Sequence, residues 1–247
     1  MVDCEIVIVV DSSGSMASIK TAMEDGMNKF LDDQKALPGT CNVTLVTFDS
    51  GPNSEARINE VYVSKPINNV PPFSLSPDGG TPLFDALGKT LTATEERLVP
   101  RNTGTIVDYA AQPGKTLFIV ITDGEENTSR EFTRAQIKTL VERVTTEHGW
   151  EFSYLGANVD AFKEAATTGI SVGTSSGYVA NAAGVTSMLR SVSYSTASYR
   201  STGMYGFSDD QRTAMGGTKL DSSLVNPVVS SAGPVTVGEG EEDPDRI

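Results

Sequence analysis

Two uninterrupted runs of large apolar residues stand out along the chain, at residues 6–10 and at residues 117–121. Runs without polar alternation are typical of strands that are buried on both faces, as in the middle of a mostly parallel sheet. The first run leads directly to Asp11, and the second reaches Asp123 after one threonine. The pattern therefore predicts two central strands, each of which places a carboxylate at its carboxyl end.

Periodic patterns fill most of the chain around these two strands. Apolar residues at helical spacing predict amphipathic helices over residues 16–36, 82–98, 133–147, 161–167, 181–200 and 209–215. Alternating or β-branched stretches predict further strands over residues 42–48, 57–64, 150–155 and 170–172. The looser alternation of residues 57–64 suits a sheet edge, and a hairpin with residues 42–48 would make that edge antiparallel.

The order of these elements predicts a doubly wound α/β domain, with a mostly parallel sheet and one antiparallel edge strand, over residues 1–175. Residues 99–115 contain prolines and glycines and are expected to form an irregular connection. Residues 176–247 are rich in Ser, Thr, Gly and Ala, which predicts an extended and helical C-terminal arm. Its acidic end, at residues 239–245, would ordinarily be disordered.

A short polar segment follows the first apolar run. In it Asp11, Ser13 and Ser15 place one carboxylate and two hydroxyls at alternate positions. Hard cations such as Mg²⁺ prefer oxygen ligands, and open α/β sheets bind ligands beyond the carboxyl ends of their strands. The triplet therefore fits half of a metal site, although Ser and Asp also cap ordinary helices. The presence of Asp123 favours the interpretation as a metal site, because the close carboxylates of Asp11 and Asp123 would repel each other unless a cation lay between them.

A third polar position, Thr81, follows the pair Gly79-Gly80. The glycines permit backbone angles closed to other residues, so Thr81 can be held on an exposed loop tip. Pro82 then begins a helix, which Thr81 would cap if it had no other role. A phosphate-binding loop is a poor fit, because Lys89 lies far from the glycines and no Gly-Lys-Ser/Thr follows.

These motifs resemble the metal-ion-dependent adhesion site (MIDAS) of von Willebrand factor A domains, written as Asp-x-Ser-x-Ser, then Thr, then Asp. All five positions occur here in that order, at Asp11, Ser13, Ser15, Thr81 and Asp123. The resemblance covers roughly residues 2–172 and extends to Gly-Gly-Thr-Pro-Leu, Ile-Thr-Asp-Gly-Glu-Glu-Asn and Leu-Gly-Ala-Asn. In these stretches the chain is more similar to small stand-alone bacterial and phage members than to large extracellular adhesion proteins.

The resemblance implies a Rossmann-like fold and a bound Mg²⁺ or Mn²⁺. The hydroxyls of Ser13 and Ser15 would contact the ion directly, Asp11 and Asp123 would act mainly through bound waters, and Thr81 would enter or leave the shell with ligand state. Such an ion has few charged ligands, so it could take a carboxylate from a partner protein.

A protein-binding module is therefore expected, with an AAA+ ATPase or a neighbouring assembly subunit as the partner that supplies Asp or Glu. The alternative is a structural component of a phage virion or other assembly, anchored through the C-terminal arm.

Charge and composition narrow the possible partners and setting. The formal net charge is -13, which argues against nucleic acid and anionic membranes as partners. No secretory leader and no membrane-spanning run is evident, so a cytoplasmic location is expected, or a virion if the protein is phage-encoded. In that setting Cys4 and Cys41 are expected to be free, buried thiols, although they could form a disulfide if their predicted strands are neighbours.

Enzymatic activity is not expected. A phosphatase with Asp11 as its nucleophile usually wants a second aspartate where Ser13 stands. A serine hydrolase that used Ser15 would need a base, and the single histidine, His148, follows a predicted helix far from this edge of the sheet.

Overall fold

A mixed sheet forms the centre of the protein, for which a computed structural model describes residues 3–99 and 113–221. Within these residues the sheet has six strands in the order β3-β2-β1-β4-β5-β6. The strands are β1 (Cys4–Asp11), β2 (Cys41–Ser50), β3 (Ala56–Pro66), β4 (Thr116–Thr122), β5 (Glu151–Gly156) and β6 (Ser176–Gly177). All neighbouring pairs are parallel except β2 and β3. The predicted fold class, including its antiparallel edge, is confirmed.

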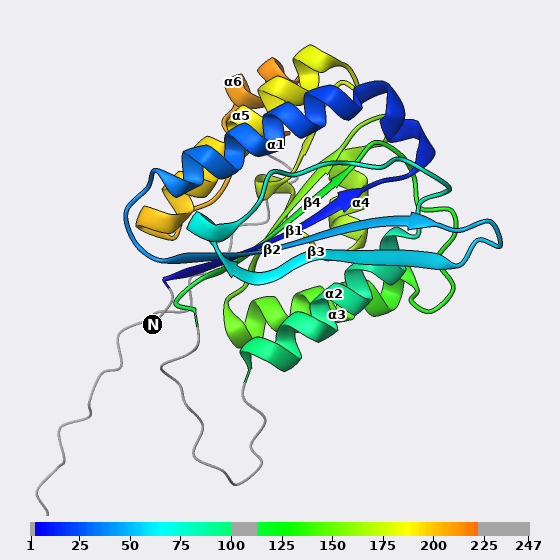
Figure 1. Ribbon diagram of the computed structural model, residues 1–247, viewed down its shortest axis with the longest axis horizontal. Coiled ribbons are helices and arrows are strands. Elements are labelled where there is room, and N and C mark those ends of the chain that lie inside the picture. The colour runs from blue at the N-terminus through cyan, green and yellow to red at the C-terminus, as the bar shows by residue number, and fades with distance from the viewer. Residues whose placement is uncertain (1–2, 100–112, 222–247) are drawn as a thin grey trace, which may run out of the picture.

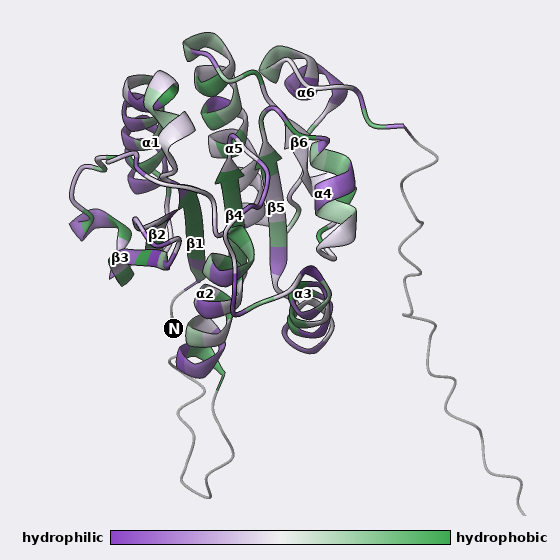
Figure 2. Cartoon of the chain, turned by 90° about the vertical axis from the view of Figure 1, so that its right-hand side faces the viewer, coloured by the Kyte–Doolittle hydropathy of each residue, from purple (hydrophilic) through white to green (hydrophobic). Residues whose placement is uncertain are grey.

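Helices cover both faces of this sheet (Figure 1). One face carries α1 (Lys20–Lys35), α5 (Ala182–Thr202) and α6 (Asp209–Met215). The other carries α2 (Leu83–Leu98), α3 (Arg134–His148) and α4 (Ala161–Thr167). Figure 2 shows the apolar central strands enclosed between the two helical layers.

The central strands are buried on both sides, as their composition predicts. Along β1, Ile6 and Ile8 enter the hydrophobic core beneath α1, whereas Val7 and Val9 enter the core beneath α2 and α3. Alternate side chains of a strand point to opposite faces, so an unbroken apolar run supplies both cores at once. The same alternation fixes the register of β1 and β4 and brings their carboxyl ends to one edge.

The prediction of a strand at residues 170–172 is wrong. Residues 170 and 171 have no regular secondary structure, a 3₁₀ turn (Val172–Thr174) follows them, and the edge strand β6 begins two residues after that turn. Hydroxyl groups close the turn, since Ser171 Oγ accepts from the Gly173 N–H at 3.2 Å and Thr174 Oγ1 donates to Ser171 O at 3.0 Å. Side chains of this kind compete with the backbone bonds of a strand.

Packing continues without a break past residue 175. β6 pairs with the end of β5, and α5 lies along α1 (Figure 1). The two helices approach closely at Gly26, where an added β-carbon would lie 2.5 Å from Leu189 Cδ1. Gln34 Nε2 donates to Ser193 O at 3.1 Å, and Lys115 Nζ donates to Tyr199 O at 3.1 Å. Both helices predicted after residue 175 are present, and both contribute to the core of the domain.

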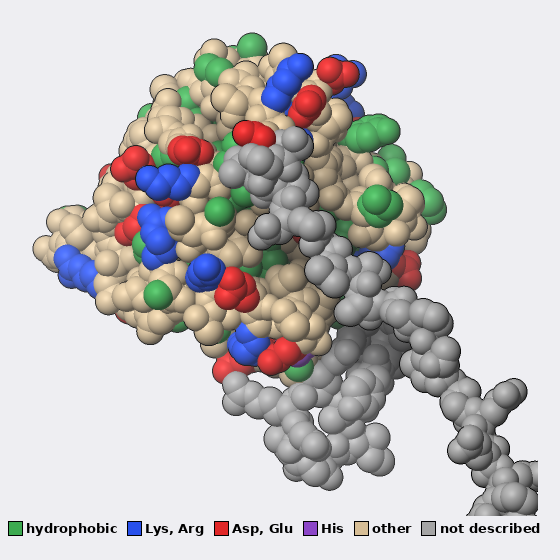
Figure 3. Space-filling model, turned by 180° about the vertical axis from the view of Figure 1, so that it is seen from behind, with side chains coloured by type: hydrophobic (Ala, Val, Ile, Leu, Met, Phe, Trp, Pro, Cys, Tyr) green, Lys and Arg blue, Asp and Glu red, His purple; other side chains and the backbone are tan. Residues whose placement is uncertain are grey.

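Two other expectations concern residues that lie outside the described part of the chain. They are the acidic end at residues 239–245 and most of the connection at residues 99–115. No helix in the described segments combines the length and the apolar character needed to cross a membrane. Acidic and basic side chains are interspersed over the face shown in Figure 3.

Cys4 and Cys41 face each other directly across β1 and β2. Both are free and buried, as predicted. Hydrogen bonding with Cys41, together with burial, raises the pKa of the Cys4 thiol. This thiol is therefore held in its protonated, unreactive form.

Candidate metal-binding site

Two buried carboxylates lie at the carboxyl edge of the sheet, where β1 and β4 run side by side. Asp11 is the last residue of β1 and is fully buried, and Asp123 follows β4 directly with 3% of its surface exposed. Thr122 Oγ1 donates to Asp11 Oδ2 at 2.6 Å. The last residue of β4 therefore fixes the carboxylate that β1 delivers.

The segment after β1 connects the two aspartates. The Ser13 N–H donates to Asp11 Oδ1 at 2.7 Å, and the hydroxyl oxygens of Ser13 and Ser15 lie 3.1 Å apart. Ser15 Oγ then donates to Asp123 Oδ1 at 2.7 Å. Four of the five predicted ligands thus form one continuous chain of polar contacts.

The helix-cap alternative does not describe the role of Ser13. Residues 14–19 form a 3₁₀ turn that Ser13 precedes, but the Ser13 side chain makes no capping hydrogen bond to it. Its hydroxyl points instead toward Ser15 and is almost fully buried.

Thr81 lies on a third loop, close to the segment that follows β4. A β-carbon placed on Gly124 would lie 3.8 Å from Thr81 Oγ1. Thr81 is only 3% exposed, so the expectation of an exposed loop tip is wrong, because the residues after Asp123 fold back against it. The preceding Gly79 has φ 61°, and an added β-carbon would lie 1.8 Å from Ser50 O. Only glycine fits at position 79.

Thr81 does not cap α2 either. Pro82 occupies the capping position, and no side chain there accepts a bond from the first turn. The N–H groups of that turn, which lack acceptors within the helix, are bound by the segment after β4, since the Phe84 N–H donates to Glu126 Oε2 at 3.0 Å and the Asp85 N–H donates to Ser129 Oγ at 3.0 Å. The Thr81 hydroxyl is therefore available for another role.

The electrostatics of the two aspartates fit a divalent cation. Burial raises the pKa of Asp11 to about 6, and the nearby charge of Asp123 adds to the shift. Burial also raises the pKa of Asp123. No basic side chain among the described residues offsets either carboxylate. A cation between them would relieve the cost of two buried like charges.

The donor set is made of oxygen atoms, which suits Mg²⁺ or Mn²⁺ better than a softer metal. In the described part of the chain no cluster of three or more His, Cys, Asp or Glu side chains could hold a metal ion. A cation at this site would therefore depend on the hydroxyls of Ser13, Ser15 and Thr81 as well as on the two carboxylates.

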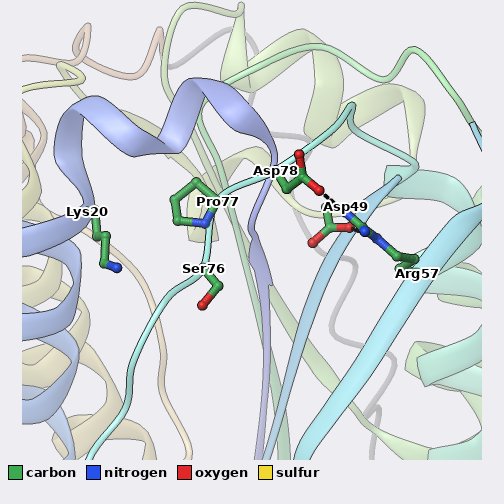
Figure 4. A pocket seen from close by; sticks show the side chains of 6 residues that line it. All are labelled: Lys20, Asp49, Arg57, Ser76, Pro77 and Asp78. Carbon is green, nitrogen blue, oxygen red and sulfur yellow. Dashed lines mark hydrogen bonds and ion pairs between the residues drawn. The ribbon is translucent and has the colours of Figure 1, made fainter. Parts of the chain in front are cut away.

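Arg57 of β3 lies beside the candidate site and pairs with two aspartates, Asp49 and Asp78, that bind Ser12 (Figure 4). Its guanidinium pairs with Asp49 and, at 2.7 Å, with Asp78, whose pKa it lowers. Asp49 Oδ2 accepts from Ser12 Oγ at 3.0 Å, and the Asp78 N–H donates to Ser12 O at 2.8 Å. Together with Lys20, the ion-paired side chains line a shallow hollow of about 500 Å³ next to the candidate site.

Sequence reasoning missed the residues that support the candidate ligands. They include Thr122, which holds Asp11, and Asn127, which binds the backbone of Thr81. Thr122 could have been found from its place beside Asp123 in Ile-Thr-Asp-Gly. Asn127 ends the stretch Ile-Thr-Asp-Gly-Glu-Glu-Asn, but that stretch does not show which backbone its side chain binds, because the partner is 46 residues away.

A model of the von Willebrand factor type A domain matches residues 5–188. No curated protein matches the sequence.

Solved structures with the same fold are distant in sequence. A von Willebrand factor type A protein from Catenulispora acidiphila is 15% identical with a TM-score of 0.52, over 79% of this chain and 43% of that one. Proximal thread matrix protein 1 of the mussel byssus is 16% identical with a TM-score of 0.52, over 78% and 46%. The pilus adhesin SpaC of Lactobacillus rhamnosus GG is 17% identical with a TM-score of 0.55, over 80% and 30%. The chain spans less than half the length of these proteins.

Proposed function

Because the chain belongs to the von Willebrand factor type A domain family, we propose that it is a protein-binding module that acts through a divalent metal ion. In this proposal Mg²⁺ or Mn²⁺ is held by Asp11, Ser13, Ser15, Thr81 and Asp123, and it captures an Asp or Glu side chain of a partner protein. The observation that carries the proposal is the continuous chain of contacts from Asp11 through Ser13 and Ser15 to Asp123.

The charge of the protein makes the metal necessary in this proposal. The chain carries a formal net charge of -13, so an acidic partner surface is repelled at long range. A divalent ion with neutral hydroxyl ligands and the two carboxylates of Asp11 and Asp123 keeps enough positive charge to bind a third carboxylate. Thr122 and the Ser13 N–H hold Asp11 in place, so the ligands need little rearrangement when the ion binds.

Binding is favoured over catalysis because no histidine lies beside the two serines, and the carboxylates that they contact, Asp11 and Asp123, are themselves candidate metal ligands. The single histidine, His148, ends α3 and lies 3.3 Å from Glu95 of α2, away from the carboxyl edge of the sheet. The alternative of a virion component gains no support from the comparisons, and the acidic end of its anchoring arm lies outside the described residues. A cytoplasmic location stays a prediction.

Titration with Mn²⁺, followed by electron paramagnetic resonance and calorimetry, tests the metal site. We expect one bound ion, and Ser13→Ala and Asp123→Asn should each weaken binding by at least about tenfold. Ser18→Ala is the matched control, because Ser18 lies exposed on the same 3₁₀ turn and bonds only Ser15 O, at 3.3 Å. A wild-type protein that binds neither Mn²⁺ nor Mg²⁺ would remove the proposed metal dependence.

Carboxylate capture is tested separately with a glutamate-containing peptide immobilised on a sensor. Binding of the Mn²⁺-loaded protein should disappear in chelator and with a peptide in which glutamine replaces glutamate. Equal binding to both peptides would contradict capture of a carboxylate.

A further inference from the structure

Asn127 joins the loop that carries Thr81 to the segment that carries Asp123. The Thr81 N–H donates to Asn127 Oδ1 at 2.9 Å, and the Asn127 N–H donates to Thr81 O at 3.1 Å. One residue therefore binds both backbone polar groups of Thr81. Asp123 lies four residues earlier in the same segment, so this pair of bonds sets the spacing between two candidate ligands that are distant in sequence.

The two segments approach too closely for any side chain to lie between them. A β-carbon added to Gly80 would lie 2.8 Å from Asn127 Oδ1 and 2.9 Å from Thr128 Cγ2. Gly80 is itself fixed from the other side, since its N–H donates to Ser50 Oγ at 2.7 Å. Gly80 thus permits the contact between Thr81 and Asn127.

Two carboxylates fix the segment after β4 to the start of α2. Glu126 accepts from the N–H groups of Phe84 and Ser129 at 3.0 and 2.7 Å. Asp85 accepts from the N–H groups of residues 130–132 at 2.8 to 2.9 Å. Asn127 is therefore attached to a segment with little freedom to move, which allows its amide to hold Thr81 in position.

We propose that Asn127 is a positioning residue of the metal site. Its amide holds Thr81 next to Asp123 and so sets the affinity for the divalent ion. This inference rests on the proposed function. It also limits how Thr81 moves: for the Thr81 backbone to leave Asp123, both of its bonds to Asn127 must break or the segment after β4 must move with it.

The test compares three substitutions in the full chain. Asn127→Leu removes the acceptor at nearly constant volume, and Asn127→Asp retains an oxygen for the Thr81 N–H. Thr128→Val is the matched control, because its buried hydroxyl has no hydrogen-bond partner among the described residues. Amide hydrogen exchange at Thr81 in chelator and Mn²⁺ affinity are measured for each variant.

Asn127→Leu should weaken Mn²⁺ binding about 10- to 100-fold, the range usual for residues that orient metal ligands. It should also speed exchange at Thr81 without metal, a change that a general loss of stability would spread over the whole sheet. Asn127→Asp should restore protection and stay within about fivefold of the wild-type affinity, because the added charge is exposed and screened. Thr128→Val should match the wild type in both measurements.

Unchanged Mn²⁺ affinity in Asn127→Leu, or unchanged exchange at Thr81, would overturn the inference. A wild-type protein that binds no Mn²⁺ would instead overturn the proposed function, and with it any effect of Asn127 on affinity. The exchange data in chelator keep these failures distinct, because they show whether Asn127 holds Thr81 in the absence of metal.

Discussion

Replacing Asp85 by alanine should destabilise the domain by about 4 kcal/mol. The carboxylate is 1% exposed, and it accepts three backbone N–H groups from the segment after β4. A hydrogen bond to a charged group contributes about 1.5 to 3 kcal/mol net, and buried donors left without a partner carry a further cost. The simple sum is an upper bound, since water can reach the exposed residues Arg130 and Glu131 once the acceptor is gone.

Urea denaturation in chelator measures this loss without a contribution from bound metal. Asp85→Asn should cost about half as much as Asp85→Ala, because its remaining oxygen can still accept from the Glu131 and Phe132 N–H groups, which Oδ1 binds in the wild type. The control is Glu131→Gln in the same segment, whose exposed pair with Lys89 should contribute less than about 1 kcal/mol. A loss below about 1 kcal/mol for Asp85→Ala would refute the reasoning, because it would mean that water satisfies the three donors.

Three further predictions concern other parts of the domain. In chelator, protonated Asp11 stabilises the fold fully below about pH 4, and this stabilisation is lost as the pH rises through 6. Mg²⁺ should therefore raise the melting temperature more at pH 7.5 than at pH 5. Equal shifts in melting temperature would count against Asp11 as a ligand. Gly26→Ala should cost about 1 to 3 kcal/mol in urea denaturation, because the new methyl group meets Leu189, and no loss would mean that α1 and α5 pack loosely. Cys4 and Cys41 should react with a thiol reagent only after unfolding, and rapid labelling of the native protein would contradict their burial.

Local patterns were sufficient for the central strands and for most of the candidate site. An unbroken apolar run is fully buried only between two cores, which places β1 and β4 in the middle of the sheet. Their final aspartates then share one edge, and the contacts of Asp11 and Asp123 with the serines between them follow from that position.

The place of α5 could not be predicted, because small hydroxyl side chains make up much of its buried face beside its apolar residues. Ser191, Ser193, Ser195 and Thr196 are all buried there, so the composition indicated a separate arm. These small side chains allow close approach to α1, and two of their hydroxyls, those of Ser193 and Ser195, form hydrogen bonds to the backbone or to neighbouring side chains. The Asn127 contact escaped prediction because the motif that contains this residue does not show which remote backbone it binds.

The direction of β1 determines how the domain can be tethered. An eight-residue strand spans about 25 Å, so a linker joined ahead of Cys4 would emerge at the far edge of the sheet from Asp11. At the other end, Gly217 packs against Gly177 and shares a hollow with Glu125, close to Asp123. Immobilisation through the amino-terminal side would therefore leave the Asp11 edge unobstructed, whereas a bulky fusion joined soon after Gly217 would crowd an approaching partner.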